Sequence, residues 1–221
     1  MMKAGNGLLA LMLAFFITPP YAWASDGMAL RDVEIGSSQE EIKRGGMVAL
    51  QLCVLCHSLK YVKFRDLQEV GFFPNEIDRF RRGAELSQGI LSTTTHQSAK
   101  RLFGMVPPDL SLMAKARQNG PRYIYSLLLA YEEGEDGAIE NGLFPGIRMP
   151  DVLAYSIEED ERVRQELEQR ARDVAAFLAW AADPRAQERL TLGRYVLAYL
   201  FLLTAMLYLV KRKTWAQLKG G

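Results

Sequence analysis

The chain has 221 residues, with 27 Lys and Arg against 26 Asp and Glu, 49% hydrophobic residues and 24% charged residues, which suits a globular domain with additional segments. This composition excludes a disordered chain, a collagen-like chain and a polytopic membrane protein, and two cysteines exclude a disulfide scaffold. A net charge of +1 provides no basic surface that would neutralise phosphates, so we expect no nucleic-acid partner.

The first 24 residues have the pattern of a secretory signal peptide. Lys3 precedes an unbroken apolar run over residues 8–17, and Ala22 and Ala24 flank Trp23 at a small-x-small cleavage site. We therefore expect residues 1–24 to direct export, with the mature chain beginning near Ser25. The alternative is an uncleaved anchor, but ten helical residues cover only about 15 Å of a hydrocarbon core of about 30 Å.

A helix is predicted to begin at Ser38 and lead toward Cys53. Ser38 and Glu41 form the pattern of a capping box, in which each side chain satisfies a backbone amide of the first turn. Two adjacent glycines, Gly45 and Gly46, lower the intrinsic stability of this helix. Their presence indicates a close crossing with another helix.

The sequence Cys53-Val54-Leu55-Cys56-His57 is a Cys-x-x-Cys-His motif, the attachment sequence for c-type haem. Positions i, i+3 and i+4 share one face of a helical turn, so two thiols can bond the haem vinyl groups while the imidazole reaches the iron. A thioredoxin-like redox pair would need a βαβ context, which the surrounding sequence lacks. A zinc site that recruits His96 would have adjacent ligands and no compact second pair.

An electron-carrying haem also needs a sixth ligand, and Met is the ligand that holds a high potential. Met149 fits best, because it lies in a stiff Gly- and Pro-containing loop over residues 143–150, far enough along the chain to return to the haem. Met105 and Met113 are alternatives that could equally fill the core. His96 would instead give a bis-His haem, although a lone His in a polar Thr run is usually just exposed.

Three further helices are predicted between the motif and the C-terminus. Asp109 is expected to cap a short helix that runs through Arg117 and stops at residues 119–120, and Pro121 is expected to start a helix over residues 123–130. Apolar residues at spacings of three and four predict an amphipathic helix over 161–182, namely Val163, Leu167, Val174, Phe177, Leu178 and Ala181. These segments predict an all-α haem domain.

The C-terminal region is predicted to be a membrane anchor. Residues 195–210 carry no charge, and residues 190–192 extend the apolar segment enough for it to span. Arg194 can extend to one interface, Trp215 suits an aromatic belt, and Lys211-Arg212-Lys213 places the C-terminus in the cytoplasm. We expect a periplasmic domain over 25–189, a transmembrane helix over 190–210 and a cytoplasmic tail over 211–221. The alternative is a buried core helix.

The charge is unevenly distributed among these segments. The exported domain keeps 21 basic residues against 26 acidic ones, a net charge of −5, and residues 132–161 contain ten acidic residues and one base, Arg148. This acidic stretch flanks Met149. We consider two interpretations: a solvated acidic loop, or a field that steers a basic redox partner toward the haem edge.

The chain resembles cytochrome c1, the haem subunit of quinol:cytochrome c oxidoreductase, from about residue 43 to 219. The matching stretches, in family order, are Arg44-Gly45, Cys53-Val54-Leu55-Cys56-His57-Ser58, Tyr61-Val62-Lys63-Phe64-Arg65-Asp66-Leu67, Pro107-Pro108-Asp109-Leu110-Ser111, Ala116-Arg117, Tyr123-Ile124-Tyr125-Ser126-Leu127-Leu128, Phe144-Pro145-Gly146, Ile147-Arg148-Met149-Pro150, residues 173–182 and Lys211-Arg212-Lys213-Thr214-Trp215. Many cytochromes share the haem motif alone, but this whole series with an anchor is specific.

The resemblance implies a class I cytochrome c-like fold with one haem c, covalently attached through Cys53 and Cys56. It implies that His57 and Met149 are the axial ligands and that Pro108 supplies backbone near the proximal His. It also implies that Arg117 and Tyr123 meet a haem propionate, where a forked, charged donor suits a partly buried carboxylate.

The resemblance further implies an electron-transfer subunit in a bacterial inner membrane, which does no bond chemistry itself. It would accept electrons from a Rieske iron-sulfur protein and pass them to cytochrome c, in a complex whose cytochrome b subunit oxidises quinol. Two other functions are a free-standing or oxidase-associated membrane cytochrome c, and a haem sensor with an open or easily displaced sixth site.

This chain departs from the family pattern at three places. Where family members often carry Asn-Gly-Ala before the double Pro, it has Phe103-Gly104-Met105, and the family's extra disulfide has no cysteines here. Arg148 and Asp151 flank the proposed ligand Met149. A cation at Arg148 disfavours ferric haem and raises the potential, unless Asp151 or a propionate neutralises it.

Overall fold

The computed structural model describes residues 28–134 and 137–219, so the predicted signal peptide lies outside the described residues. The chain is mostly helical, which confirms the predicted fold class. The helices are α2 (Gln39–Gln51), α3 (Pro74–Arg81), α4 (His96–Phe103), α5 (Met113–Ala116), α6 (Gly120–Leu128), α7 (Glu161–Ala182) and α8 (Ala186–Lys219), with 3₁₀ turns η1 (Cys53–Leu55), η2 (Phe64–Val70) and η3 (Tyr155–Ile157).

Two small antiparallel sheets, which the sequence did not predict, lie among these helices. One pairs β1 (Leu59–Lys63) with β2 (Gly89–Ile90), and the other pairs β3 (Tyr131–Glu133) with β4 (Ile139–Asn141). Three of the four strands have only two or three residues, too few for a period-2 pattern to show in the sequence. The β3–β4 pair immediately precedes the loop that carries Met149.

Helix α2 begins and crosses α7 as its sequence predicted. Ser38 is the N-cap, and both hydrogen bonds of the capping box with Glu41 are present. A Cβ atom built on Gly45 would lie 1.8 Å from the carbonyl oxygen of Asp173, so α7 passes directly against the backbone of α2. A glycine is therefore required at this crossing, which explains the cost in helix propensity.

A buried carboxylate joins the same two helices. Asp173 is 3% exposed and accepts two hydrogen bonds from the Arg44 guanidinium, at 2.7 Å and 3.0 Å, and a third from Gln169 at 2.9 Å. The forked geometry compensates the desolvation of the carboxylate. It also fixes the rotation of α2, whose C-terminal end leads into the Cys-x-x-Cys-His motif.

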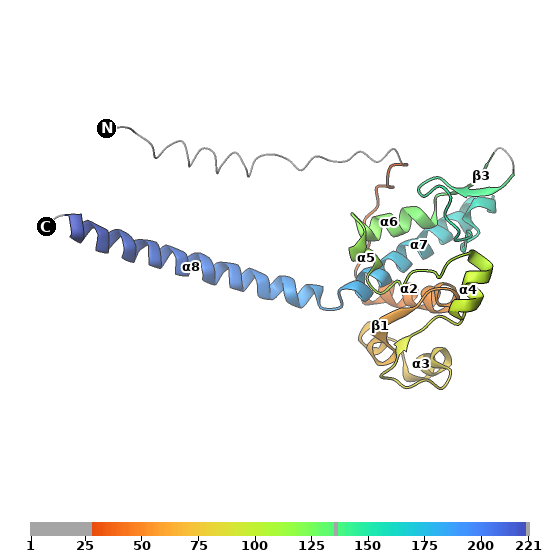
Figure 1. The fold of residues 1–221 in the computed structure, drawn as a ribbon, viewed down its shortest axis with the longest axis horizontal. Coiled ribbons are helices and arrows are strands. Elements are labelled where there is room, and N and C mark those ends of the chain that lie inside the picture. The colour runs from red at the N-terminus through yellow and green to blue at the C-terminus, as the bar shows by residue number, and fades with distance from the viewer. Residues whose placement is uncertain (1–27, 135–136, 220–221) are drawn as a thin grey trace.

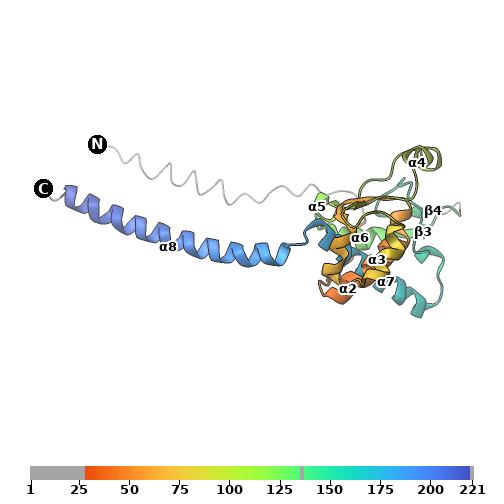
Figure 2. The same ribbon diagram turned by 90° about the horizontal axis from the view of Figure 1, so that it is seen from below.

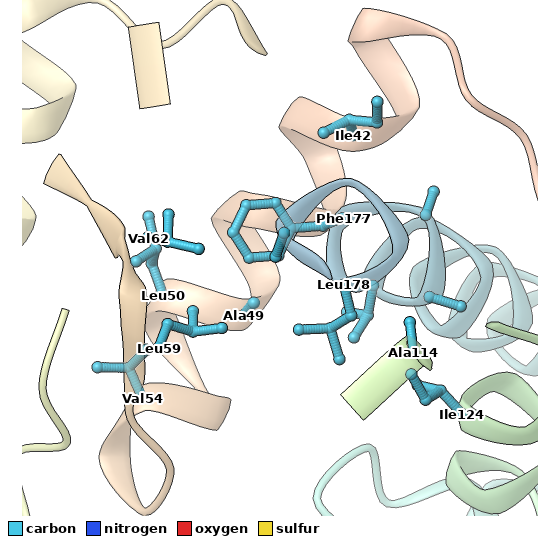
Figure 3. Packing of buried hydrophobic residues seen from close by; sticks show 14 of the residues in the cluster. Ile42, Ala49, Leu50, Val54, Leu59, Val62, Ala114, Ile124, Phe177 and Leu178 are labelled. Carbon is cyan, nitrogen blue, oxygen red and sulfur yellow. The ribbon is translucent and has the colours of Figure 1, made fainter. Parts of the chain in front are cut away.

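The hydrophobic core is centred on α7. Figure 3 shows Phe177 and Leu178 projecting from α7, with Leu50 of α2 and Leu59 of β1 nearby. Five of the six predicted apolar positions of α7 are buried, as expected for an amphipathic helix, and Val163 is 36% exposed. Val163 lies in the first turn of α7.

The segment before α6 differs from its predicted form. Asp109 does not cap α5, which begins at Met113. Its carboxylate instead accepts hydrogen bonds from the backbone amides of Lys60, at 3.0 Å, and Ser111, at 2.9 Å. Asp109 therefore joins this segment to β1. Helix α6 ends at Leu128, two residues before the predicted end, because the chain turns there into β3.

Helix α8 extends away from the rest of the described chain (Figures 1 and 2). Its residues 186–217 are long and apolar enough to cross a membrane, and its most apolar window has no buried residue. This exposure contradicts the alternative of a buried core helix. Between α7 and α8, the Asp183 carboxylate pairs with Lys115 of α5, at 3.0 Å, and with Arg189 of α8. These two cations hold the pKa of Asp183 below its usual 3.8.

Candidate haem-binding site

The Cys-x-x-Cys-His motif folds as a tight turn directly after α2. The α-helix ends at Gln51 and Cys53 begins the 3₁₀ turn η1, where the sequence predicted a turn of ordinary helix. The carbonyl oxygen of Cys53 accepts hydrogen bonds from the amides of Cys56, at 3.1 Å, and His57, at 2.8 Å. Both hydrogen bonds end on the carbonyl oxygen of Cys53, so the turn keeps the two thiols and the imidazole close together within five residues.

Cys53 is half-buried and packs against the hydrophobic core, and no disulfide joins it to Cys56. Burial raises the pKa of the Cys53 thiol to about 11. A redox-active pair needs a thiol whose pKa is lowered, and in the described residues the strands form only antiparallel pairs. Both observations argue against a thioredoxin-like function for this motif.

His57 is oriented by a backbone carbonyl from a distant segment. Its Nδ1 atom lies 2.7 Å from the carbonyl oxygen of Pro108. A carbonyl can only accept a hydrogen bond, so Nδ1 carries the proton and Nε2 presents a lone pair. Burial lowers the pKa of His57, which favours this neutral form. A neutral, oriented imidazole with a free Nε2 is the form that binds a metal.

The segment that contains Pro108 is itself fixed to the motif. The amide of Leu110 donates a hydrogen bond to the carbonyl oxygen of Ser58 at 2.8 Å, one residue after His57. The Asp109 carboxylate holds the amide of Lys60, as described above. The hydrogen bonds of Asp109 and Leu110, the two residues after Pro108, therefore hold the carbonyl that orients the His57 imidazole. The Cys-x-x-Cys-His motif alone did not predict these two bonds.

Arg117 and Tyr123 also lie together. The guanidinium carbon of Arg117 lies 6.0 Å from the centre of the Tyr123 ring. Arg117 is exposed and follows α5, whereas Tyr123 belongs to the first turns of α6. A guanidinium and a phenol presented by two consecutive helices can donate hydrogen bonds to one carboxylate.

The predicted sixth ligands have different environments. Met149 is half-buried and packs against the core cluster that Cys53 also contacts, and Met113 packs against the same cluster. Met105 is 51% exposed. His96 is exposed at the start of α4, where it lines a cavity of about 90 Å³ together with Cys56.

Known proteins with similar sequences are named as cytochromes or haem proteins. The sequence profile described as the Cytochrome C1 family matches residues 35–218. The chain belongs to the cytochrome c1 family. Relatives include "Cytochrome c1 1, heme protein, mitochondrial" of Arabidopsis thaliana, 34% identical over 92% of this chain and 74% of the relative, and "Cytochrome c1" of Rhodospirillum rubrum, 34% identical over 82% of this chain and 83% of the relative. "Cytochrome b/c1" of Bradyrhizobium diazoefficiens is 29% identical over 79% of this chain and 33% of the relative.

The described residues give the alternative of a zinc site no support. Within residues 28–134 and 137–219, no three His, Cys, Asp or Glu side chains are grouped so that they could hold a metal ion. The donor set fits a haem instead, because two thiols and one neutral imidazole share a turn and a thioether packs against the same core.

The two charged neighbours of Met149 do not pair with each other. Arg148 donates a hydrogen bond from Nη1 to the carbonyl oxygen of Phe103, at 3.0 Å, at the end of α4. Asp151 accepts hydrogen bonds from the amides of Leu153 and Ser156. The Asp151 carboxylate therefore binds backbone amides of the segment after Met149, and it does not neutralise the charge of Arg148.

Two residues of the site were missed by sequence reasoning. The hydroxyl of Tyr131 donates a hydrogen bond to the carbonyl oxygen of Met149, and Asn141 binds three backbone groups around the start of the same loop. Neither residue belongs to a motif. An Asn-Gly pair at 141–142 marks a turn, but only the fold shows what the side chain holds.

Proposed function

We propose that this chain binds one haem c covalently through Cys53 and Cys56, with His57 and Met149 as axial ligands. The observation that carries the proposal is the hydrogen bond between His57 Nδ1 and the carbonyl of Pro108, which leaves Nε2 free for iron. Arg117 and Tyr123 would hold a propionate. When bound, the haem takes up and releases one electron at a time, and the residues of the chain hold it, orient it and limit its contact with water.

The chain then serves as the electron-transfer subunit of a quinol:cytochrome c oxidoreductase. It accepts electrons from a Rieske iron-sulfur protein, passes them to a cytochrome c and assembles with a cytochrome b subunit. Membership of the cytochrome c1 family supports this function, and the relative named "Cytochrome b/c1" supports a cytochrome b partner. The chain itself forms and breaks no substrate bond.

The same proposal includes a membrane topology. Residues 1–24 are a signal peptide, 25–189 a periplasmic haem domain, 190–210 a transmembrane helix and 211–221 a cytoplasmic tail, all in a bacterial inner membrane. The exposed, apolar helix α8 supports the anchor, and the bacterial relatives from Rhodospirillum rubrum and Blastochloris viridis support the compartment. Lys211 and its basic neighbours support the orientation.

An acidic surface near the Met149 loop is suited to a basic cytochrome c. Glu132, Glu133 and Glu140 are exposed on β3 and β4, and Glu159 is exposed before α7, while Glu135 and Asp136 lie outside the described residues. Because Tyr131 of β3 contacts the backbone of Met149, the next two residues of this strand, Glu132 and Glu133, are adjacent to the loop of the proposed ligand. Charges of one sign beside a redox centre raise the association rate of an oppositely charged partner.

Purification of the tagged full-length chain in mild detergent tests the function. We expect a b-type cytochrome and an iron-sulfur protein to co-purify with a covalently attached haem c. A c-type haem without either partner would show a free-standing cytochrome. Binding of carbon monoxide to the reduced protein at neutral pH would indicate a sensor with an open sixth site. Replacement Met149→Leu tests the ligand, because an unchanged potential and spectrum would exclude Met149.

A further inference from the structure

The loop that carries Met149 begins and ends at one pair of residues in the β3–β4 sheet. Tyr131 and Asn141 are directly opposite each other in this antiparallel pair. Asn141 contacts the start of the loop and Tyr131 contacts Met149 near its end. A single cross-strand pair therefore defines both ends of a segment of eight residues, 142–149, that contains neither helix nor strand.

Asn141 fixes the start of the loop to α6. The side chain is 1% exposed, and its Nδ2 donates to the carbonyl oxygen of Leu127 at 2.9 Å. Its Oδ1 accepts from the amides of Leu143, at 3.1 Å, and Phe144, at 2.9 Å. Two of these three hydrogen bonds hold the loop itself, because movement of the loop would leave the buried Oδ1 of Asn141 without its two donors.

Tyr131 fixes the end of the loop. Its side chain is 5% exposed and its hydroxyl donates to the carbonyl oxygen of Met149 at 2.8 Å. A carbonyl oxygen can only accept, so the Tyr131 hydroxyl is the donor of this bond. The bond acts on the main chain of the proposed ligand itself.

We propose that Tyr131 is a positioning residue for the sixth haem ligand, with Asn141 as its counterpart at the other end of the loop. This inference rests on the proposed role of Met149. A thioether is a weak ligand, so it stays on the iron only if the loop holds it in place at little entropic cost. Pro145, Gly146 and Pro150 break regular structure around Met149, which leaves side chains to supply the support.

The chain offers a matched control. Tyr155 is also 5% exposed, and its hydroxyl donates to Glu168 at 2.8 Å and accepts from Arg31 at 3.4 Å, outside the Met149 loop. Tyr131→Phe and Tyr155→Phe each remove one buried hydroxyl with a partner and leave the ring in place. Because the Tyr155 hydroxyl has two charged partners, Tyr155→Phe should lower the thermal stability at least as much as Tyr131→Phe, yet only Tyr131→Phe should affect the ligand.

The experiment uses the full-length haem protein in its membrane complex. We expect Tyr131→Phe to accelerate hydrogen exchange of the amides in residues 143–149 about fivefold, the factor expected for loss of one ordinary hydrogen bond. We also expect it to weaken the near-infrared absorption of Met-ligated ferric haem, to lower the midpoint potential and to raise carbon monoxide binding by the reduced protein. Tyr155→Phe should change none of these four readouts.

Met149→Leu in the same complex distinguishes an error in the ligand assignment of Met149 from an error in the positioning role of Tyr131. If Met149→Leu retains the near-infrared band, Met149 is not the ligand and the proposed function of this residue is wrong. If Met149→Leu abolishes the band while Tyr131→Phe matches Tyr155→Phe in every readout, the positioning role of Tyr131 is wrong and the ligand assignment stands. Equal loss of the band in both Tyr variants also contradicts the positioning role, because it shows general destabilisation.

Discussion

Replacement Gly45→Ala should separate helices α2 and α7 and destabilise the haem domain. The new Cβ would lie 1.8 Å from the carbonyl oxygen of Asp173, whereas a carbon and an oxygen need about 3.3 Å, so the helices must move apart by about 1.5 Å. A gap of that size forfeits more than half of the dispersion energy across the crossing. Overpacking of this kind costs about 3 kcal/mol or more, against a gain of about 1 kcal/mol from helix propensity.

Gly46→Ala is the matched control, because it makes the same chemical change one residue further along the same helix. There the new Cβ would meet the rings of Phe72, at 3.0 Å, and Phe177, at 3.1 Å, which can give by a few tenths of an ångström. For Gly46→Ala, the steric cost of the new Cβ and the gain in helix propensity should cancel to within about 1 kcal/mol of unfolding free energy.

Thermal unfolding of the full-length protein in detergent, followed by Soret absorbance and far-ultraviolet circular dichroism, measures both variants. We expect Gly45→Ala to lower Tm by roughly 4 to 12 °C, from a net loss of about 2 to 3 kcal/mol, and Gly46→Ala to change it by less than about 4 °C. A Tm for Gly45→Ala at or above that of Gly46→Ala would refute the close crossing as the reason for this glycine.

Three further predictions follow from charged residues. Arg148→Gln should lower the midpoint potential of the haem in a spectroelectrochemical titration, by about 20 mV if the guanidinium lies about 10 Å from the iron in a dielectric of about 80. An unchanged or raised potential contradicts the unneutralised cation. Because the folded-state pKa of Asp183 is depressed, its carboxylate stabilises the protein above pH 3.8 and loses this effect as the pH falls through the folded-state pKa. Asp183→Asn should therefore lower Tm at pH 7, and its Tm should approach that of the wild type as the pH falls below 3.8 toward the depressed folded-state pKa, whereas a Tm difference that stays constant over this fall would exclude the mechanism. The triple replacement of Glu132, Glu133 and Glu159 by Gln should slow the reaction with a basic cytochrome c severalfold at low salt and flatten its dependence on ionic strength in stopped-flow measurements, and equal salt dependence in both proteins would leave only a solvated acidic surface.

The sequence predicted those features that local chemistry determines. The capping box at Ser38, the bounds of α7 and the apolar helix at the C-terminus follow from capping, periodicity and hydropathy, and all three are present. The paired glycines predicted a crossing, and Gly45 shows it. The Cys-x-x-Cys-His motif and its order among other short stretches were enough to indicate the family.

Features that depend on distant contacts were not predictable. Asp109 has the residue type and position of a helix cap, but the amide of Lys60, 49 positions earlier, competes for its carboxylate. Tyr131 has the hydrophobic environment of a core residue, and nothing near it in the sequence indicates that its hydroxyl meets Met149. Such roles arise only when separate elements pack, so single-sequence patterns do not contain them.

The junction at Asp183 gives the haem domain a mechanical connection to its anchor. Lys115, which pairs with Asp183, lies two residues before Arg117 on the same short segment, and Arg189 of α8 pairs with the same Oδ2 atom of Asp183. Asp183 therefore links the first turn of α8 to the segment that ends at Arg117, without passing through the core. Hydrophobic mismatch with the bilayer is one influence on the tilt of a membrane helix. If a change in tilt acts through Asp183, we expect midpoint potentials measured in bilayers of short and long acyl chains to differ more in the wild type than in Asp183→Asn.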